Sequence, residues 1–418
     1  MQLPRSLAAL RHRDFRLYWT GQAVSLSGTW MQQMAIGWVV TDLSSDATVL
    51  GLLNVASAVP MLLLSLKGGE LADRFEKRRI LIATQVALML LAFAYAALVY
   101  SGVIALVHVF ALGVLFGVTA AFDLPAWQAM PPELVDRADI PNAVALMQSI
   151  FHGARLVGPA LAGILIARFG RASAFAANGA SFLAVIGTLV AIAPRAGSPR
   201  TAPGPRRGGM IREGLAYVRT EPAIRGLLSL TALVTGLVFP FLAVLMVYYV
   251  RYALGSDDAR VLGIFMSASG LGSLVGSAAI LSGSRATRRR WLVAGVVGVA
   301  LGMTGLALAT RLPFAVASSL VLSFSVSSLM GRASQMVQER VPGELRGRVM
   351  GIYSLSFTGI MPFSAMFWSW LVDRLGKGEG YRLAMQISAV LFVVAGLAVV
   401  LRAWAALGED KVEASAIG

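Results

Sequence analysis

Long apolar runs without charge constrain this chain more than any other feature. Residues 86–100 read VALMLLAFAYAALVY, and residues 291–310 contain no charged side chain. Runs of about 18 or more apolar residues are long enough to cross the ~30 Å hydrocarbon core of a bilayer as helix. Because the backbone must satisfy its own hydrogen bonds there, helices are expected and open strands are not. The sequence therefore predicts an all-helical, multi-pass membrane protein.

Composition agrees with this prediction. Of the 418 residues 57% are hydrophobic and only 14% are charged, whereas a soluble protein carries roughly 25% charged residues. The formal charge of +15 raises the question of nucleic-acid binding, but the basic residues gather in alternate connections and form no aromatic-interleaved stripe. The chain has no cysteine, so disulfides and thiolate metal sites are excluded.

The apolar runs predict twelve membrane spans in two sets of six. The first set lies near residues 15–40, 48–68, 79–101, 104–125, 140–167 and 173–193. The second set lies near residues 224–249, 260–282, 291–310, 312–335, 346–371 and 381–405. Alternate connections, with the two termini, hold 27 Lys and Arg residues on one side and 8 on the other. Since positive charge accumulates on the cytoplasmic side, both termini are expected in the cytoplasm.

The longest break divides the chain into residues 1–194, a cytoplasmic linker over 195–222, and residues 223–418. The linker begins rich in Pro, Gly and Arg, and its end, MIREGLAYVRT, predicts a short amphipathic helix at the membrane surface. The two halves also look like copies, because ARFG at 167–170 and DRLG at 373–376 recur 206 residues apart. Six-plus-six parallel repeats are typical of one large transporter fold, which binds its substrate near the midplane.

A dense charge cluster follows the second predicted span. GGELADRFEKRR (68–79) resembles motif A of the major facilitator superfamily, G-x-L-A-D-R-x-G-R-[KR], in the connection where that family carries it. Two positions differ, because Glu76 stands where the pattern prefers Gly and Lys77 where it prefers Arg. The matching residues are Gly69, Leu71, Ala72, Asp73, Arg74 and Arg78.

Two further stretches narrow the resemblance. Residues 120–163, together with RASQMVQERVPGELRGRVMG in the second half, resemble the branch that includes the enterobactin exporter and the transmembrane secretion effector proteins. Within that stretch GPALAG (158–163) is similar to the GPxxGG motif C of exporters, with Ala162 in place of one glycine. The resemblance implies export, with Gly158, Pro159 and Gly163 as the motif positions and bending of the fifth helix at the first two.

The resemblance also gives the charge cluster a role. It implies that Asp73 steadies the N-terminus of the eleventh helix, where a carboxylate meets the positive end of the helix dipole. It further implies that Lys77 pairs with Asp123 at the cytoplasmic end of the fourth helix. Together these residues would form a conformational latch between the halves. The alternative is a solvated, positively charged turn. The latch residues are Gly69, Asp73, Arg74, Lys77, Arg78 and Asp123.

Arg155 is the one ionisable residue that this span map places near mid-depth. A cation inside a membrane span marks by default a site with a partner or an anionic ligand, and the alternative is packing beside Gly153 and Gly158. His152 lies on the same helix face at i, i+3 spacing. It is a candidate proton carrier, as is Asp123, and the alternative for His152 is a hydrogen bond between helices.

The first predicted span has glutamines where dedicated exporters of lipophilic cations have a carboxylate. We expect Gln33 and Trp30 from this span, with Tyr353 and Phe357 from the eleventh, to bind substrate beside Arg155. Aromatic residues in spans also face lipid or pack between helices, so this alternative stays open.

These features predict a major facilitator exporter in a bacterial inner membrane. Its expected substrate is an amphipathic small molecule, with anions among the candidates, such as a siderophore or a drug, and proton antiport is the expected drive. A lysophospholipid transporter is the alternative, and a non-transporting receptor or scaffold is a remote one. No catalytic or metal constellation is present in the sequence, so neither an enzyme nor a cofactor is predicted. Expected partners are the substrate, protons and membrane lipids, with no nucleic acid and a monomeric chain.

Overall fold

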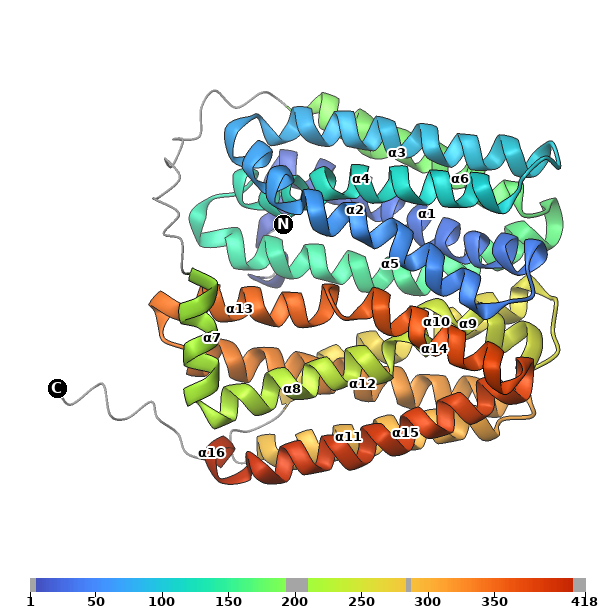
Figure 1. Cartoon of the computed structure of the whole chain (residues 1–418). Coiled ribbons are helices and arrows are strands. Elements are labelled where there is room, and N and C mark those ends of the chain that lie inside the picture. The colour runs from blue at the N-terminus through green and yellow to red at the C-terminus, as the bar shows by residue number, and fades with distance from the viewer. Residues whose placement is uncertain (1–4, 193–209, 283–286, 409–418) are drawn as a thin grey trace. The chain divides into compact units, whose positions relative to one another are not determined.

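The computed structural model describes residues 5–192, 210–282 and 287–408, and almost all of them are helical (Figure 1). No strand occurs within these ranges. The first half contains η1 (Arg5–Arg11), α1 (Arg13–Leu43), α2 (Ala47–Arg74), α3 (Lys77–Tyr100), α4 (Leu106–Ala129), η2 (Pro131–Glu133), η3 (Arg137–Asp139), α5 (Ile140–Phe169) and α6 (Ala172–Ala191). The second half begins with α7 (Met210–Thr220), α8 (Pro222–Leu237), η4 (Pro240–Val244), α9 (Met246–Tyr248), η5 (Tyr249–Ala253), α10 (Ala259–Ala278) and η6 (Ala279–Ser282). It ends with α11 (Arg288–Leu308), α12 (Leu312–Arg340), α13 (Gly343–Thr358), α14 (Met361–Leu375), α15 (Lys377–Arg402) and α16 (Trp404–Gly408).

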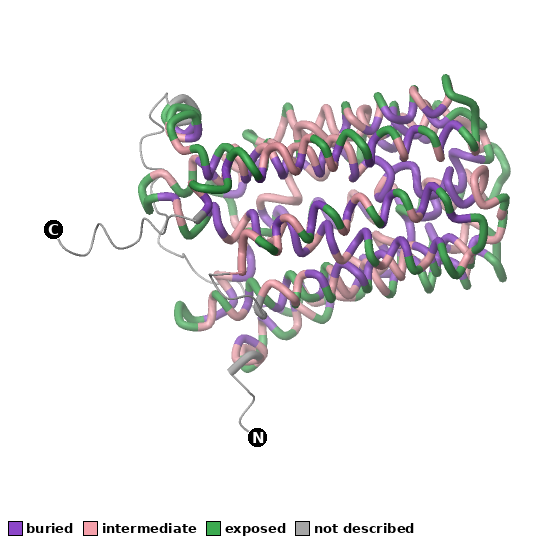
Figure 2. Tube along the Cα trace, turned by 90° about the horizontal axis from the view of Figure 1, so that it is seen from below, coloured by how far each residue is buried: buried purple, intermediate pink, exposed green. Residues whose placement is uncertain are grey.

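Ten helical segments in the described part of the chain are long and apolar enough to cross a membrane. Large apolar side chains on them are open to the surroundings, as Leu63 (73%), Leu66 (77%) and Val107 (69%) show. Figure 2 shows such exposed positions along the length of the helices as well as at their ends. Because exposed apolar surface of this extent is unfavourable in water, the protein is a multi-pass membrane protein.

Two predicted spans are not among these ten, for different reasons. Helix α1 has 31 residues, but its middle carries glutamine, serine and threonine side chains that lower its hydropathy. The seventh predicted span, 224–249, is broken: α8 ends at Leu237 and two π-helical turns follow, η4 and η5. Pro240 begins the first of these turns, where it removes a backbone donor from the helix. Apolar length alone therefore finds ten of the twelve predicted spans.

The eleventh predicted span, 346–371, is also interrupted. Helix α13 ends at Thr358 and α14 begins at Met361, with Gly359 and Ile360 between them. Pro362 lies in the first turn of α14, where proline is tolerated because its missing N–H has no partner in the helix. The predicted span is present within Gly343–Leu375, as two consecutive helices, and the break follows from Gly359 and Pro362.

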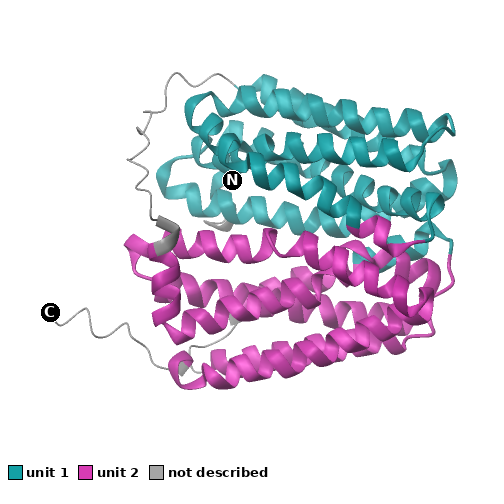
Figure 3. Ribbon diagram, viewed as in Figure 1, with its two compact units in different colours: residues 1–45, 52–204, 257–267 teal, residues 46–51, 205–256, 268–418 magenta. Residues whose placement is uncertain are grey.

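The described chain divides into two compact units (Figure 3). Unit 1 comprises residues 1–45, 52–204 and 257–267, and unit 2 comprises residues 46–51, 205–256 and 268–418. In unit 1, α1 packs against α5 and α6, and α3 packs against α4 and α6. In unit 2, α11 packs against α12 and α15, and α15 also packs against α8 and α14.

Helices α2 and α4 of unit 1 meet along glycines. A Cβ atom on Gly68 would collide with the carbonyl oxygen of Ala121, and one on Gly117 would collide with that of Ser57. Small residues of this kind let helix backbones approach closely within a membrane. This contact positions the C-terminal half of α4, which carries Asp123.

The unit boundaries cross two helices. The first residues of α2, Ala47 to Gly51, belong to unit 2, whereas the rest of α2 belongs to unit 1. Asp373 of α14 accepts hydrogen bonds from the backbone N–H groups of Ala47 (2.8 Å) and Thr48 (2.7 Å) and from the Thr48 hydroxyl (2.5 Å). In the same way the start of α10, up to Ser267, belongs to unit 1, and the Ser267 hydroxyl donates to the Leu156 carbonyl at 2.7 Å.

The predicted amphipathic helix is present as α7. It packs against α13 within unit 2, and Arg348 of α13 forms an ion pair with Glu213 of α7. Gly214 and Val218 are buried, while Arg219 is exposed. One face of α7 is therefore covered by the bundle and the other is open.

Candidate functional site

A cavity of about 170 Å³ lies inside unit 1. Its wall combines a carboxylate and side-chain amides with aromatic rings, which is the composition of a ligand site that is mostly apolar with a few placed polar groups. The polar lining residues are Gln22, Ser25, Thr29 and Gln32 of α1, Gln85 of α3, Asp123 of α4 and Asn178 of α6. The aromatic lining residues are Phe116, Trp127, Phe151 and Phe182.

Asp123 is the one acidic residue in this wall. Its Oδ1 accepts a hydrogen bond from the Thr84 hydroxyl at 2.6 Å and another from the Gln85 amide at 2.9 Å. Both donors are buried on α3, at 8% and 4% exposure. An ionised carboxylate can only accept hydrogen bonds, whereas the protonated form also donates one. Proton uptake by Asp123 would therefore rearrange these contacts.

Hydrogen bonds hold side-chain amides of the cavity wall in place. The Trp127 indole N–H donates to the Gln22 Oε1 at 3.2 Å, and the Asn178 amide donates to the Gln32 Oε1 at 2.7 Å. The buried Nε2 of Gln22 and Oε1 of Gln85 have no hydrogen-bond partner among the described residues. Since an unsatisfied buried polar group costs about 1–3 kcal/mol, the cavity favours a ligand that supplies both a donor and an acceptor.

The lining residue Phe151 contacts a cation–π pair, Trp30 and Arg155, that does not itself line the cavity. Phe151 lines it and makes an edge-to-face contact with Trp30, with ring centroids 5.9 Å apart. The Arg155 guanidinium, one turn further along α5, lies over the Trp30 ring at 5.5 Å, a cation–π distance. The structure thus brings the predicted residues Trp30 and Arg155 together. Their partner at the cavity edge is Phe151.

His152 follows Phe151 and contacts its ring edge-to-face at 5.8 Å. Its Nδ1 is buried without a hydrogen-bond partner in the described part of the chain. His152 does not line the cavity, whereas Asp123 does. Of the two predicted proton carriers, Asp123 alone is placed where a ligand can meet it.

The other predicted binding residues are placed differently. Gln33 is exposed, while its neighbour Gln32 is buried and turned to Asn178. Tyr353 and Phe357 lie one turn apart on α13 of unit 2. The Tyr353 hydroxyl donates to the Met330 carbonyl at 3.2 Å, and Phe357 packs edge-to-face on Phe239 at 4.9 Å. Both side chains therefore have packing partners within their own unit.

The latch pair expected between Lys77 and Asp123 is wrong in this structure. The Lys77 ammonium instead pairs with Glu133 of η2 at 2.6 Å. The reason is depth. Asp123 lies level with Thr84 and Gln85, seven to eight residues along α3 from Lys77, and a helix rises about 11 Å over that stretch. A lysine at the start of α3 cannot reach so far, whereas the loop after α4 lies beside it.

The remaining motif A residues serve mainly their own loop. Arg74 pairs with Glu70 one turn back at 2.5 Å. Arg78 donates to the carbonyls of Leu189 (2.6 Å) and Val190 (3.1 Å) at the end of α6, where a cation also complements the helix dipole. Asp73 is exposed in the last turn of α2, and Gly69 has open space around it. The glycine needed for packing is its neighbour Gly68.

The motif C residues lie at close helix contacts of unit 1. A Cβ atom on Gly158 would lie 2.6 Å from the Ser27 carbonyl oxygen of α1. One on Gly163 would lie 3.1 Å from the Ala259 carbonyl oxygen, and one on Gly263 2.7 Å from that of Pro159. Helix α5 continues through Pro159. These positions therefore bring α5 close to α1 and to the start of α10.

Several site residues were not singled out from the sequence. Thr84 and Gln85 interrupt an apolar run, which is a usable signal for a buried polar contact in a membrane helix. Asn178 carries the same signal in α6.

Arg332 of α12 is a second cation inside a helix. It is only 2% exposed, donates to the Ala279 carbonyl at 2.6 Å and lies over the Trp291 ring at 4.5 Å. No three His, Asp or Glu side chains in the described ranges gather closely enough to hold a metal ion.

Relatives of the chain are transporters. It is 26% identical over 378 residues to the multidrug efflux pump Tap of Mycolicibacterium fortuitum, which covers 88% of this chain and 91% of that protein. It is 24% identical over 392 residues to macrolide efflux protein A of Streptococcus pyogenes, covering 91% and 94%. The staphyloferrin A transporter of Staphylococcus aureus is 32% identical over 161 residues, 38% of this chain and 41% of that one.

Solved structures share the fold at low sequence identity. A bacterial homologue of the human lysosomal transporter Spinster, inward-facing and unoccupied, matches with a TM-score of 0.72 at 13% identity, covering 97% of this chain and 98% of that one. The nucleoside transporter NupG matches with a TM-score of 0.73 at 12% identity, covering 93% and 98%. The model of the transmembrane secretion effector family matches residues 5–416. The chain therefore belongs to the transmembrane secretion effectors of the major facilitator superfamily, a family of membrane transporters.

Proposed function

We propose that this protein exports amphipathic small molecules across a bacterial inner membrane, driven by proton antiport. In this proposal it has twelve membrane spans, counting α1 and the broken segment from α8 to η5, with both termini in the cytoplasm. Its relatives Tap and macrolide efflux protein A are named as efflux proteins, which supports export. Transport would occur by alternating access, in which the substrate site opens to one side of the membrane at a time.

The observation that carries the proposal is the cavity of unit 1 together with the Trp30–Arg155 pair, which contacts the lining residue Phe151. Asp123 with the side-chain amides provides a group that exchanges protons and hydrogen bonds, and Trp30, Phe151 and Arg155 provide apolar contact and a positive charge. An amphipathic anion, such as a siderophore or an acidic drug, would place its charged group at Arg155 and its rings against the aromatics. Asp123 would carry the proton.

The test is transport in proteoliposomes with an imposed pH gradient, using an anionic siderophore-like substrate and a cationic dye. We expect Arg155→Ala to lower transport of the anion at least about tenfold, the effect of ~1.4 kcal/mol, because the bound anion loses its counter-charge. Arg168→Ala is the matched control, since Arg168 is an exposed arginine on the same helix. If Arg155→Ala transports the anion as well as wild type does, the proposed anion site is wrong.

The proton role is tested separately with Asp123→Asn, which keeps a polar side chain but has no exchangeable acidic proton. We expect gradient-driven transport to be lost while exchange of labelled for unlabelled substrate continues. Asp258→Asn is the control, because Asp258 lies outside the spans beside Arg260. A gradient response that survives in Asp123→Asn and disappears in His152→Gln would move the proton role to the histidine.

A further inference from the structure

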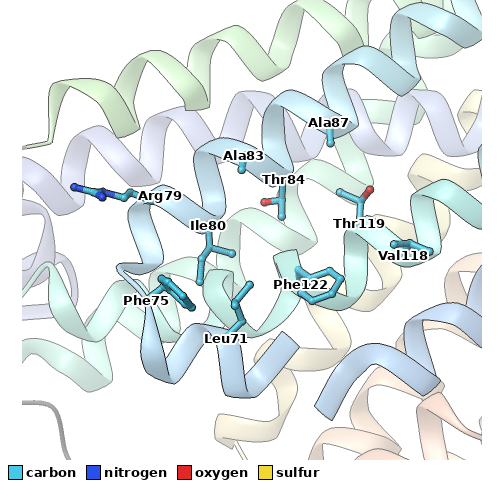
Figure 4. Close-up of a pocket in the computed structure, with 10 residues that line it drawn as sticks. All are labelled: Leu71, Phe75, Arg79, Ile80, Ala83, Thr84, Ala87, Val118, Thr119 and Phe122. Carbon is cyan, nitrogen blue, oxygen red and sulfur yellow. The ribbon is translucent and has the colours of Figure 1, made fainter. Parts of the chain in front are cut away.

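A second, larger hollow of unit 1 is lined by residues of α2, α3 and α4. This groove has a volume of about 560 Å³ and shares no lining residue with the cavity. Figure 4 shows it bounded by the end of α2, by α3 and by α4, with Arg79 at one end and Ala87 and Val118 at the other. The lining residues are Leu71, Phe75, Arg79, Ile80, Ala83, Thr84, Ala87, Val118, Thr119 and Phe122.

Helices α3 and α4 form the wall between groove and cavity. Neighbouring residues face opposite ways: Thr84 lines the groove and Gln85 the cavity, and Phe122 lines the groove and Asp123 the cavity. The groove is therefore a separate surface of unit 1. It lies on three helices that are each apolar enough to cross a membrane, with exposed positions such as Phe75 at 60%.

The chemistry of the groove is apolar along its length. Two of its three polar side chains are satisfied within the protein, because the Thr84 hydroxyl donates to Asp123 at 2.6 Å and the Thr119 hydroxyl donates to the Leu115 carbonyl at 2.8 Å. From Arg79 to Ala87 the groove follows α3 for eight residues, or about 12 Å of helix. The groove therefore suits a hydrocarbon chain, because the hydroxyl donors of both threonines along it are already used within the protein.

The third polar side chain is Arg79, at the end of the groove beside the α2–α3 connection. Its side chain is 81% exposed, and its Nε lies 2.9 Å from Glu76. A guanidinium has four further N–H donors in a fork that fits a phosphate. The other cations of this loop are engaged elsewhere, Arg74 with Glu70, Lys77 with Glu133 and Arg78 with α6. Arg79 thus provides the positive charge at the groove end.

We propose that this groove binds one phospholipid with a negatively charged headgroup, its phosphate at Arg79 and one acyl chain along α3 and α4. Charge complementarity selects the headgroup, because anionic lipids are attracted to basic residues at the membrane surface. The apolar wall of the groove favours the acyl chain of the lipid. This site lies beyond the proposed export function and needs only the membrane location of the family.

The test is native mass spectrometry of the purified protein titrated with phosphatidylglycerol or phosphatidylcholine. The wild-type protein is expected to retain one phosphatidylglycerol molecule in preference to phosphatidylcholine. Arg79→Gln should lower this preference about fivefold, the effect of one basic residue near anionic lipid. Arg74→Gln should leave it unchanged, because Arg74 sits in the same loop and pairs with a carboxylate but does not line the groove. Equal losses in the two variants would indicate general surface charge and overturn the site.

The acyl-chain part of the proposal is tested by filling the groove. Ala83→Trp places an indole in it and should abolish retention of either lipid, whereas Ala97→Trp, at an exposed alanine of α3 outside the groove, should retain phosphatidylglycerol. If Ala83→Trp does not fold, Ala87→Phe fills the groove instead and should likewise abolish lipid retention. Retention by both groove-filled variants, or displacement of the lipid by inorganic phosphate alone, would refute the proposal.

Discussion

Replacing Asp373 with alanine removes the acceptor for three hydrogen bonds at the first turn of α2. The carboxylate acts there as a cap, since it binds the N–H groups of Ala47 and Thr48 that no helix carbonyl can reach. Loss of a cap costs about 0.5–2 kcal/mol. The Thr48 hydroxyl bond and the helix-dipole interaction add about 1 and 0.3–1 kcal/mol. We therefore expect Asp373→Ala to lower the free energy of unfolding of unit 2 by about 2–4 kcal/mol.

Thermal unfolding followed by tryptophan fluorescence measures this change. The chain has eight tryptophans and no cysteine, so thiol-reactive dyes do not report on it. For a folded unit of about 200 residues, 1 kcal/mol corresponds to about 2–4 °C. The expected decrease in the unfolding temperature is therefore about 4–16 °C.

Thr48→Val is the matched control, because it removes the hydroxyl bond but keeps both backbone bonds to Asp373. It should lower the free energy of unfolding by only about 1 kcal/mol. The double variant should unfold at the same temperature as Asp373→Ala, because the hydroxyl has no acceptor left to lose. A decrease of less than about 2 °C in Asp373→Ala, or full additivity in the double variant, would contradict the capping argument.

Three further predictions follow from contacts elsewhere. Gly117→Ala should destabilise unit 1 by about 1–3 kcal/mol, because the new methyl group would collide with the Ser57 carbonyl. Gly153→Ala is the control: this glycine has open space around it, so the change should stabilise the helix by ~0.5–1 kcal/mol. The unfolding temperature measures both effects. Arg332→Lys should destabilise unit 2 by about 1–2 kcal/mol, since an ammonium cannot reproduce a guanidinium that both donates to Ala279 and stacks on Trp291; an unchanged unfolding temperature would show that charge alone suffices. Hydrogen bonds from Arg260 hold the pKa of Asp258 below its usual value, so this carboxylate stabilises the protein above its unfolded pKa of ~3.9 and progressively less as the pH falls through the lower folded pKa. Because the pair is exposed, Asp258→Asn should cost under about 1 kcal/mol at pH 7 and less at about pH 3, as comparison of unfolding temperatures at both pH values would measure.

Membrane location and the helical class could be predicted because both depend on local composition. A run such as residues 86–100 has the length and apolarity of a span whatever its neighbours do. The helix breaks after Leu237 and Thr358 were harder to predict, since proline and glycine also occur inside unbroken membrane helices, as Pro159 does in α5. Whether such a residue breaks a helix depends on its packing partners.

The candidate site could be predicted only in part. Arg155 and Asp123 are visible in the sequence because charge in a membrane helix is rare. Their partners are not, because Asp123 meets Thr84 and Gln85 from a helix about 40 residues away, and no motif links them. The expected pair of Lys77 with Asp123 was wrong for the same reason: a motif names residue types but not the depth at which each side chain lies.

The sharing of α2 and α10 between the units has a consequence for biogenesis. The cap on α2 needs Asp373, which is synthesised 322 residues after Gly51. At 5–20 residues per second the ribosome takes roughly 15–65 s to cover that distance. During this interval the first turn of α2 lacks the Asp373 carboxylate, and unit 1 lacks residues 257–267, which come from beyond the linker. The first half is therefore not a finished module when it leaves the ribosome, and it is completed only after translation has passed the start of α10 and Asp373 of α14.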